Sequence, residues 1–375
     1  MTEKISKSAL ILPGGGARGS YQVGVVKGIA EILGADNNPF PVICGTSAGA
    51  INAAVLASHA DNFQHGINRL EQFWGGLQCS DIYRTDSLNI IKTMSRLVAS
   101  VLFGGFGVNA PQSLLDNTPL NHLLHRSLRL QGIDRSIHSG DLDAVSVTAS
   151  AYTSANAISF YQGKSGIHNW QRSRRKGVAE TLQVKHILAS SALPFLFPAQ
   201  CIGTQYFGDG GLRMVAPLGP AIHLGATKIL IVGTRDRQSI PEPQTLVDYP
   251  SLGELGGYML DTIFMDNLDA DLSRLLRINR TLALLNTEQK KQTGLRQIET
   301  YVIRPSEDVR EITRQHANAI PRSVRLLLKS VGGWGKDWRM PSYLLFESEY
   351  TRALMDLGYR DALSQAEDIQ AFFAK

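Results

Sequence analysis

Short apolar runs alternate with longer helical periods in the first part of the chain. Residues 8–12 form an apolar run that predicts a buried strand, and residues 18–33 have the spacing of a helix. Residues 40–44 predict the next strand, and the helix-prone residues 50–56 follow it closely. This strand–helix–strand–helix order with short connections predicts an α/β fold, in which helices cover both faces of a mainly parallel sheet.

The remainder of the chain continues the pattern and then changes in composition. Prolines 241, 243 and 250 indicate a linker after Thr234. Residues 252–285 then have a helical pattern whose first half is acidic and whose second half is basic, in agreement with the helix dipole. We therefore predict a first domain over residues 5–235 and a helix-rich C-terminal extension over residues 236–375, packed on the core. Further strands are predicted at residues 144–151, 157–162, 204–207, 228–233 and 299–304.

One apolar segment has two interpretations. Residues 90–108 carry little charge and many apolar side chains. They predict either a pair of core helices or a mobile lid over an apolar site.

Composition and charge narrow the class of protein. The 375 residues carry a net charge of +5, which suits an anionic surface or substrate but is too diffuse to indicate nucleic acid. Three widely spaced cysteines, without metal-ligand spacing, favour a reduced compartment. The first apolar stretch ends at Gly14, too early for a signal peptide, and the longer uncharged stretches contain proline and glycine. We expect a cytoplasmic protein, soluble or peripheral on the inner membrane surface.

Ser47 stands where a strand turns sharply into a helix. It occupies the centre of Gly45-Thr46-Ser47-Ala48-Gly49, directly after one apolar run and before a helix-prone segment. Glycines permit a strained turn that a Cβ atom would obstruct, and the turn leaves the serine hydroxyl at a helix N-terminus. The pattern predicts a nucleophile elbow.

A glycine loop precedes this elbow by one strand. Gly14, Gly16 and Gly19 match the spacing of a dinucleotide-binding loop, but the second strand does not end in the acidic residue that would bind a ribose. The alternative is an oxyanion site, because backbone N–H groups of a glycine loop form a positively polarised concavity. Gly15, Gly16 and Ala17 are then expected near Ser47. Arg18 would either contact an anionic head group or brace the loop.

The serine needs a proton acceptor. His223 is a weak candidate, because it lies in a predicted helix without a surrounding motif. Asp209 is favoured, since it follows a strand-like segment and begins the turn Asp209-Gly210-Gly211. An aspartate held within hydrogen-bond reach acts as a base to serine without an intervening imidazole.

These motifs together resemble those of the patatin-like phospholipase family. The matching segments are residues 14–19, 45–49 and 209–211, and residues 189–198 resemble the small-residue and proline segment that precedes the aspartate in that family. The resemblance spans residues 8–218. It implies a three-layer α/β/α fold and hydrolysis of lipid esters without a metal or other cofactor. It also implies Ser47 as nucleophile, Asp209 as base, and an oxyanion hole at Gly14, Gly15, Gly16 and Ala17.

Two alternatives to the hydrolase stay open. An acyltransferase would use the same elbow to pass the acyl group to an alcohol or thiol, and a catalytically silent protein would only bind lipid. The nucleotide-binding interpretation ranks last.

Contact with a membrane has its own sequence signal. Within the segment from Arg322 to Arg339, residues 322–331 have one apolar and one basic helical side, and Trp334 and Trp338 follow them. This pattern fits either an interfacial anchor or a surface helix that docks on the core. We expect a lipid ester as substrate and no nucleic acid partner, and the sequence leaves the oligomeric state open.

Overall fold

A mixed sheet lies at the centre of the molecule. The computed structural model describes residues 7–34, 37–86, 95, 112–236, 249–335 and 337–374. Five neighbouring strands are parallel and run in the order β10-β9-β1-β2-β3. Their bounds are β1 (Ser8–Leu12), β2 (Val42–Thr46), β3 (Ala144–Ala151), β9 (Lys228–Val232) and β10 (Glu299–Ile303). Every residue of β2, β3 and β9 is buried, as expected for parallel strands covered on both faces.

Shorter and partly antiparallel strands complete one side of the sheet. β4 and β8 both pair antiparallel with β3, and β8 brings Asp209 opposite Ala149. The bounds on this side are β4 (Ala157–Gly163), β5 (Trp170–Arg172), β6 (Arg175–Ala179), β7 (Gln200–Ile202) and β8 (Gln205–Asp209).

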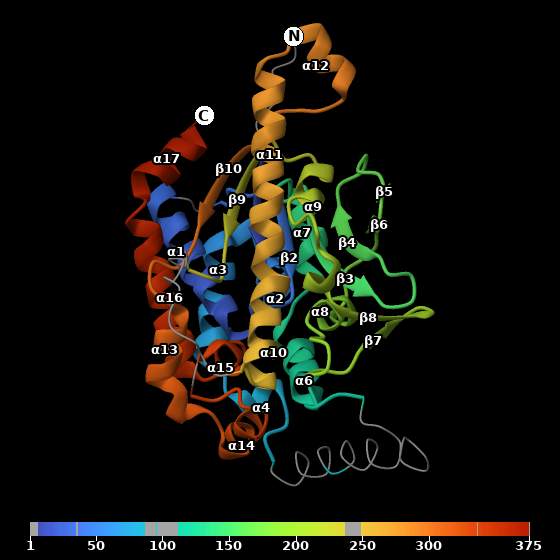
Figure 1. Cartoon of the computed structure of the whole chain (residues 1–375). Helices are drawn as coiled ribbons and strands as arrows, with labels where there is room; N and C mark the ends of the chain where they lie inside the picture. Colours follow the sequence, from blue (N-terminus) through green and yellow to red (C-terminus); the bar gives the residue numbers. More distant parts are fainter. Residues whose placement is uncertain are drawn as a thin grey trace.

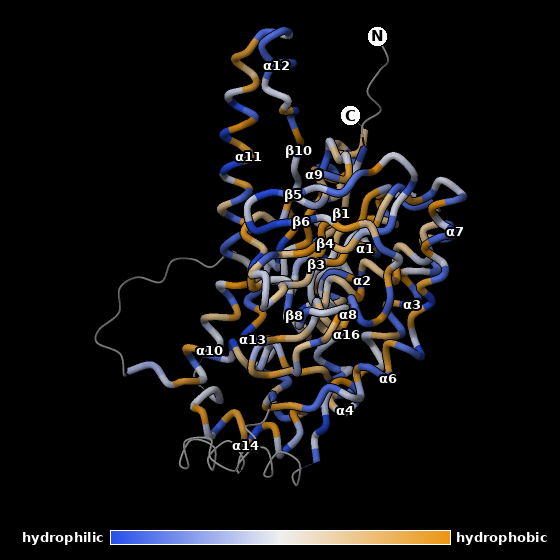
Figure 2. The backbone as a smooth tube through the Cα atoms, turned by 90° about the vertical axis from the view of Figure 1, so that its right-hand side faces the viewer, coloured by the Kyte–Doolittle hydropathy of each residue, from blue (hydrophilic) through white to orange (hydrophobic). Residues whose placement is uncertain are grey.

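Helices cover the two faces of the sheet. In Figure 2, α3 and α11 lie on opposite sides of the strands, which gives three layers. α2 contacts β1, β2 and β3 on one side, and α9 contacts β1 and β2. The helices of this part are α1 (Ser20–Leu33), α2 (Ala48–Ser58), α3 (Phe63–Gly75), α4 (Cys79–Ile82), α6 (Thr118–Ser127), α7 (Gly132–Ser139), α8 (Val184–Ser190) and α9 (Gly219–His223), with 3-10 turns η1 (Gly16–Gly19), η2 (Ala60–Asn62) and η3 (Gly210–Arg213).

The C-terminal region, residues 249–374, is mainly helical. Its first helix, α10, continues through the π-helical segment η4 into α11, which crosses the front of the sheet in Figure 1. α12 lies beyond the end of the sheet in both views (Figures 1 and 2). The bounds are α10 (Leu252–Asp261), η4 (Thr262–Asp266), α11 (Asn267–Ala283), α12 (Thr287–Thr293), α13 (Val309–His316), η5 (Ala317–Ala319), α14 (Arg322–Ser330), α15 (Arg339–Leu344), α16 (Ser348–Leu363) and α17 (Ala366–Ala374).

The C-terminal region packs closely against residues 7–236, which we call the N-terminal region. β10 extends the sheet beside β9, and α16 lies along α1. The two helices approach so closely that a Cβ atom at Gly24 would lie 1.8 Å from the Met355 carbonyl oxygen, and one at Gly358 would lie 2.2 Å from that of Tyr21. Glycine is therefore required on both sides of this contact.

The predicted α/β class, with a mainly parallel sheet and a helix-rich C-terminal part, is confirmed. The long helix predicted at residues 252–285 is divided by η4, and the strands β5, β6 and β7 were not predicted. The predicted boundary between residues 235 and 236 stays a prediction. The two interpretations of residues 90–108, as core helices or as a lid, concern residues that mostly lie outside the described part of the chain. Pro241 and Pro243 of the predicted linker also lie outside it. In the described part of the chain, no helix is both long and apolar enough to cross a membrane.

The amphipathic helix predicted after Arg322 is α14, and its apolar side faces the protein. Val324, Leu327 and Leu328 are all buried in the core. The rings of Trp334 and Trp338 pack against each other with centroids 5.1 Å apart, and both side chains are half-buried. The structure therefore matches the docked-helix interpretation for α14 itself.

Candidate active site

Ser47 lies on a strained turn between β2 and α2. Its φ of 56° and ψ of −126° are rare for a residue with a side chain. The turn is possible because Gly49 packs onto the end of β1, where a Cβ atom would lie 1.9 Å from the Leu12 carbonyl oxygen. At Gly45 a Cβ atom would lie 2.3 Å from the Gly49 carbonyl oxygen. Both glycines are needed for this geometry, which is the sharp strand-to-helix turn that the sequence predicted.

A buried hydrogen-bond chain holds the elbow in place. The Ser47 N–H donates to Ser190 Oγ over 2.9 Å, and Ser190 Oγ donates to the Thr148 carbonyl over 2.6 Å. Ser190 is the last residue of α8, and Thr148 belongs to β3. Three elements therefore fix the serine backbone.

Asp209 ends β8 and is completely buried. Its Oδ1 accepts a hydrogen bond of 2.9 Å from the Gly211 N–H, and its own N–H donates to the Ala192 carbonyl over 2.8 Å. Oδ2 is also buried, and it has no hydrogen-bond partner among the described residues. Half of this carboxyl group is thus left free to accept a proton.

Burial controls the charge of this carboxyl group. Loss of solvent raises the pKa of Asp209 to about 7, although the Ser47 hydroxyl and the Gly211 amide both act to lower it. The Ser47 hydroxyl lies close enough to Asp209 to lower this pKa, although Oδ2 itself has no hydrogen-bond partner among the described residues. Such contacts often tighten only when a substrate binds.

The glycine loop lies against the elbow. A Cβ atom at Gly14 would be 2.9 Å from Ser47 Cβ, so the two backbones are in contact. Gly16 has a φ of +55° and lies against the Tyr343 carbonyl, where a Cβ atom would come within 2.3 Å. Thr234 Oγ1 donates to the Gly14 carbonyl over 2.8 Å. The loop is therefore fixed from both regions of the chain.

Arg18, the predicted anion contact, lies inside the protein. Its guanidinium pairs with Asp261 over 3.0 Å and donates to Ser342 Oγ over 2.6 Å. It also lies 4.0 Å from the centroid of the Tyr343 ring, and the Tyr343 hydroxyl donates to Asp261 over 2.6 Å. These contacts favour the bracing role that the sequence left open, because Arg18 is only 2% exposed.

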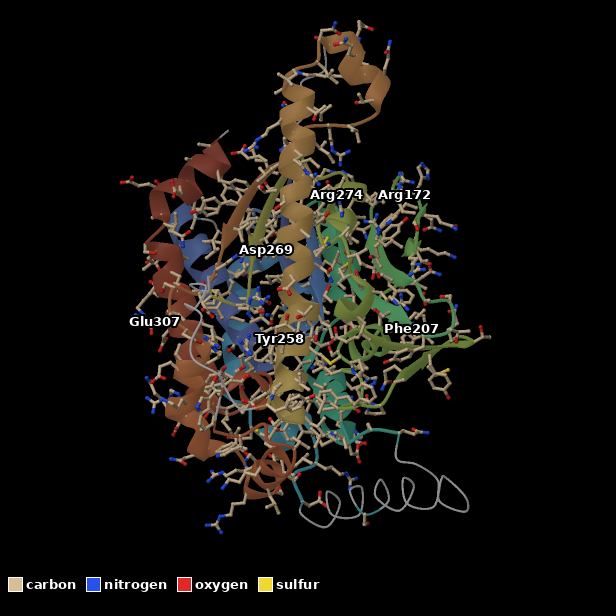
Figure 3. The ribbon with its side chains drawn as sticks, in the orientation of Figure 1. Arg172, Phe207, Tyr258, Asp269, Arg274 and Glu307 are labelled. Atoms are coloured by element: carbon tan, nitrogen blue, oxygen red, sulfur yellow. The ribbon has the colours of Figure 1, made fainter. Side chains whose placement is uncertain are left out.

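The π-helical segment η4 places an aromatic ring beside the glycine loop and the turn after Asp209. A Cβ atom at Gly14 would lie 2.3 Å from the Phe264 ring, and one at Gly211 would lie 3.1 Å from it. Phe264 thus contacts both the glycine loop and the turn that holds Asp209. Figure 3 shows Tyr258 on the preceding helix α10 and Asp269 on α11, which places η4 between them in front of the sheet.

An apolar cavity opens from Ser47 on the α2 side of the sheet. We call it the α2-side cavity. Gly16 and Ser47 are among its lining residues, and most of the remaining lining comes from α2, α3, α6 and Phe346. Leu120, Leu193 and Phe197 are among its buried lining residues. The lining is almost free of polar side chains.

His223, the weaker candidate for the base, belongs to a different environment. Its ring stacks on Trp170 with centroids 4.9 Å apart, and burial lowers its pKa to about 4. None of the contacts described for His223 involves Ser47 or Asp209. The structure brings together Ser47, Asp209 and the glycine loop, and it leaves this histidine apart.

Sequence reasoning missed three side chains at the site. Ser190 lies within the family-like segment 189–198, so its motif was noticed but its hydrogen bond to Ser47 was not. Asp261 and Phe264 reach the site from the C-terminal region, and no local pattern around them signals that role.

The chain is similar to proteins that are already known. A family model described as patatin-like phospholipase matches residues 10–222. Lysophospholipase nte1 of Aspergillus terreus is 50% identical over 52 residues, which are 14% of this chain and 3% of that protein. The chain thus matches only a small part of that relative's length. Among solved structures, VipD from Legionella pneumophila is similar over 94% of this chain and 67% of that chain, with 13% identity and a TM-score of 0.35.

Proposed function

Because the chain belongs to the patatin-like phospholipase family, we propose that it hydrolyses acyl esters of lipids through a Ser47–Asp209 dyad. The observation that supports this most strongly is the buried and unpartnered Oδ2 of Asp209, close to a serine on a strained turn. A buried carboxylate without a partner is costly, and such groups concentrate at functional sites.

The proposed reaction has two steps. Ser47 Oγ attacks the ester carbonyl carbon while its proton passes to Asp209 Oδ2, and the alcohol leaves with that proton. The acyl group is then attached to Ser47. Water attacks the acyl-enzyme, gives its proton to Asp209, and releases the fatty acid as the proton returns to Ser47.

The glycine loop is proposed to stabilise the negative charge on the carbonyl oxygen in both steps. Gly14 already contacts Ser47, and the loop is fixed at Gly16 by Tyr343. Backbone N–H groups of Gly15, Gly16 and Ala17 are the proposed donors. One preorganised donor of this kind contributes roughly 3 kcal/mol to the stability of the transition state.

We also propose that the protein contacts the lipid surface peripherally, and α10 supports this better than α14. Leu252, Tyr258 and Met259 on α10 are 76%, 58% and 56% exposed. The apolar side of α14 is buried, so a contact between Arg322 and Arg339 would depend on its half-buried tryptophans. Large exposed apolar side chains on one helix, next to a lipid site, favour insertion into an interface.

Labelling with a fluorophosphonate tests the dyad. We expect one label per chain on the Ser47 peptide, formed far more slowly in Asp209→Asn, which cannot accept the serine proton. Asp141→Asn, a change at a half-buried carboxyl group that accepts a hydrogen bond from Ser139 Oγ, serves as the control and should label at the wild-type rate. Labelling of another residue, or equal rates for Asp209→Asn and the wild type, would contradict the proposal.

A further inference from the structure

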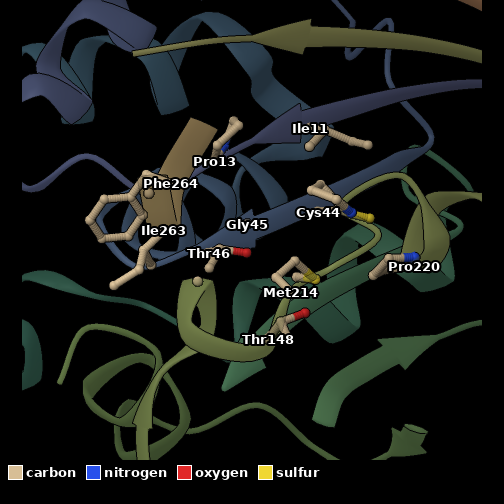
Figure 4. A pocket seen from close by; sticks show the side chains of 13 residues that line it. Ile11, Pro13, Cys44, Gly45, Thr46, Thr148, Met214, Pro220, Ile263 and Phe264 are labelled. Atoms are coloured by element: carbon tan, nitrogen blue, oxygen red, sulfur yellow. The ribbon is translucent and has the colours of Figure 1, made fainter. Parts of the chain in front are cut away.

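A polar cavity lies between α3 and α6, and the proposed reaction does not use it. We call it the α3–α6 cavity. Its volume is about 360 Å³, which falls in the range of roughly 300–1,000 Å³ that is typical of small-molecule sites. The cavity in Figure 4, beside Gly14 and Phe264, has a volume of about 20 Å³ and no charged residue in its lining. The α3–α6 cavity differs from it in both size and chemistry.

Three arginines dominate the charge of the α3–α6 cavity. Its charged and larger polar lining residues are His59, Arg69, Gln72, Asp81, Arg126 and Arg129. Arg69 belongs to α3, Arg126 belongs to α6, and Arg129 follows α6. Within the part of the chain that the structure describes, none of these arginines forms an ion pair. Asp81, the single carboxylate of the lining, accepts a hydrogen bond of 3.0 Å from the Gln78 N–H. The cavity therefore has an excess of positive charge.

Most of the guanidinium N–H groups remain available to a ligand. Arg69 Nη2 donates to the Ser127 carbonyl over 3.4 Å, which uses one of the five N–H donors of that side chain. The hydrogen bonds among the described residues use neither the Arg126 nor the Arg129 side chain. Arg126 and Arg129 are exposed and Arg69 is half-buried, so a dissolved ligand can reach the cavity from solvent.

The α3–α6 cavity is separate from the proposed nucleophile. Ser47 precedes the first residue of α2, whereas His59, which lines the cavity, follows the last. With a rise of about 1.5 Å per residue, these two ends lie roughly 18 Å apart. Burial lowers the pKa of His59 and the nearby charge of Arg69 lowers it further, so Arg69 also lies near this end of α2. In a glycerophospholipid only a few bonds separate the phosphate from the ester oxygens. A phosphate in this cavity would therefore not belong to the lipid that Ser47 attacks.

We propose that the α3–α6 cavity binds a phosphate monoester that is not the lipid being cleaved. A guanidinium group presents a planar pair of N–H donors that matches two oxygens of a phosphate. A phosphate monoester carries roughly two negative charges at neutral pH, which suits a cavity with three arginines and one carboxylate. The inference goes beyond the proposed function, because it concerns a second ligand.

The phosphate has two conceivable sources, a dissolved ester and a lipid headgroup. Figure 2 shows α3 and α10 on opposite sides of the molecule. A membrane contacted through α10 would then not face the α3–α6 cavity. A dissolved ester is therefore the ligand that we expect.

Calorimetric titration with glycerol 3-phosphate tests the site, with uncharged glycerol as a blank. We expect one molecule per chain, bound with a Kd at least about tenfold weaker in Arg126→Gln combined with Arg129→Gln. Arg277→Gln combined with Arg280→Gln is the matched control, because it removes the same charge from two exposed arginines of α11 that have no ion pair among the described residues. The control should bind like the wild type, and thermal melts check that both double variants are folded.

Co-sedimentation with phosphatidylcholine vesicles that contain phosphatidic acid distinguishes the two sources. For a dissolved ester, both double variants should bind these vesicles equally. Weaker binding of the Arg126 and Arg129 double variant alone would assign the phosphate to a lipid headgroup in the same cavity. Equal affinities of the two double variants for both probes, or no binding of either probe to the wild type, would overturn the proposal. Neither measurement depends on Ser47 as nucleophile, so a failure of the proposed reaction is distinguishable.

Discussion

The N-terminal and C-terminal regions contribute to the site in different ways. In the N-terminal region, the proposed functional residues lie in short local motifs, at Gly14–Gly16, Ser47 and Asp209, each at the end of a strand. In the C-terminal region, single side chains reach the site from helices whose sequences carry no motif. Asp261 pairs with Arg18, and Phe264 contacts Gly14 and Gly211. The proposed chemistry is thus local, whereas its support depends on contacts between residues far apart in the sequence.

This difference has a physical reason. A strained turn needs glycines next to the serine, so the elbow must be visible in consecutive residues. A stabilising contact between the two regions needs only one ion pair, and any helix that passes nearby can supply its partner. The account therefore predicts that the N-terminal motifs control rate, while the C-terminal contacts control stability and access to lipid.

The largest effect is expected from comparing two buried carboxyl groups, one in each region. Asp209 and Asp271 are both buried, both accept a backbone N–H, and burial raises the pKa of each. Asp209→Asn should lower kcat on a soluble ester by at least about 10³-fold, because the proton acceptor is lost. Asp271→Asn should change kcat by less than about threefold. Equal losses would show that Asp209 acts through the fold alone.

The next effect concerns the stability that the Arg18–Asp261 ion pair gives to the contact between the regions. Arg18→Met removes the most buried ion pair of Asp261, which keeps only the Tyr343 hydroxyl and Arg339 at 3.3 Å as partners. The free energy of unfolding should therefore fall by about 3 kcal/mol. Arg274→Met removes a half-exposed partner of Asp271 and should cost less than about 1 kcal/mol. Urea unfolding followed by circular dichroism measures both. If Arg18→Met lowers the free energy of unfolding no more than Arg274→Met does, Arg18 does not stabilise the contact between the two regions.

The pH dependence separates rate from stability at one residue. Because the base must be ionised and the pKa of Asp209 is raised to about 7, kcat/KM on a soluble ester should fall about tenfold per pH unit below that value. Stability should change in the opposite direction. The folded-state pKa lies above the ordinary value of 3.8, so the stabilising contribution of the neutral carboxyl is full below pH 3.8 and is lost as pH rises through about 7.

Stopped assays across pH 5–9 and thermal melts in the same buffers give both profiles, with Asp209→Asn as the control. The pH dependence assigned to Asp209 should be absent from the variant in both measurements. A wild-type kcat/KM that stays constant from pH 5 to 9 would argue against Asp209 as the base.

The smallest effect compares two amphipathic helices of the C-terminal region. Leu252→Ser combined with Met259→Ser removes exposed apolar side chains from α10 and should weaken binding to anionic phospholipid vesicles by about three- to tenfold. Leu326→Ser changes an exposed leucine of α14 and should have no effect. Co-sedimentation measures both. Weaker binding for Trp334→Ala with Trp338→Ala, but not for the α10 variant, would restore α14 as the contact.

The sequence predicted the central strands and the candidate site because both depend on local patterns. β1 and β3 lie where their apolar runs placed them, and Ser47 and Asp209 lie at the strand ends that their flanking glycines indicated. β5 and β6 were missed, because their residues are mostly polar and only partly buried. Three features could not be predicted, since each depends on distant residues meeting in the fold. They are the docking of the apolar side of α14 on the core, the contacts of Phe264 and the Arg18–Asp261 pair.

Trapping the acyl-enzyme tests most directly whether Ser47 is the nucleophile. The protein is mixed with a diacyl phospholipid, quenched in acid during turnover, and digested for peptide mass analysis. The account predicts a peptide that contains Ser47 and is heavier by one acyl group, and it predicts no adduct and no hydrolysis for Ser47→Ala. An acyl group on another residue, or continued hydrolysis by Ser47→Ala, would contradict it.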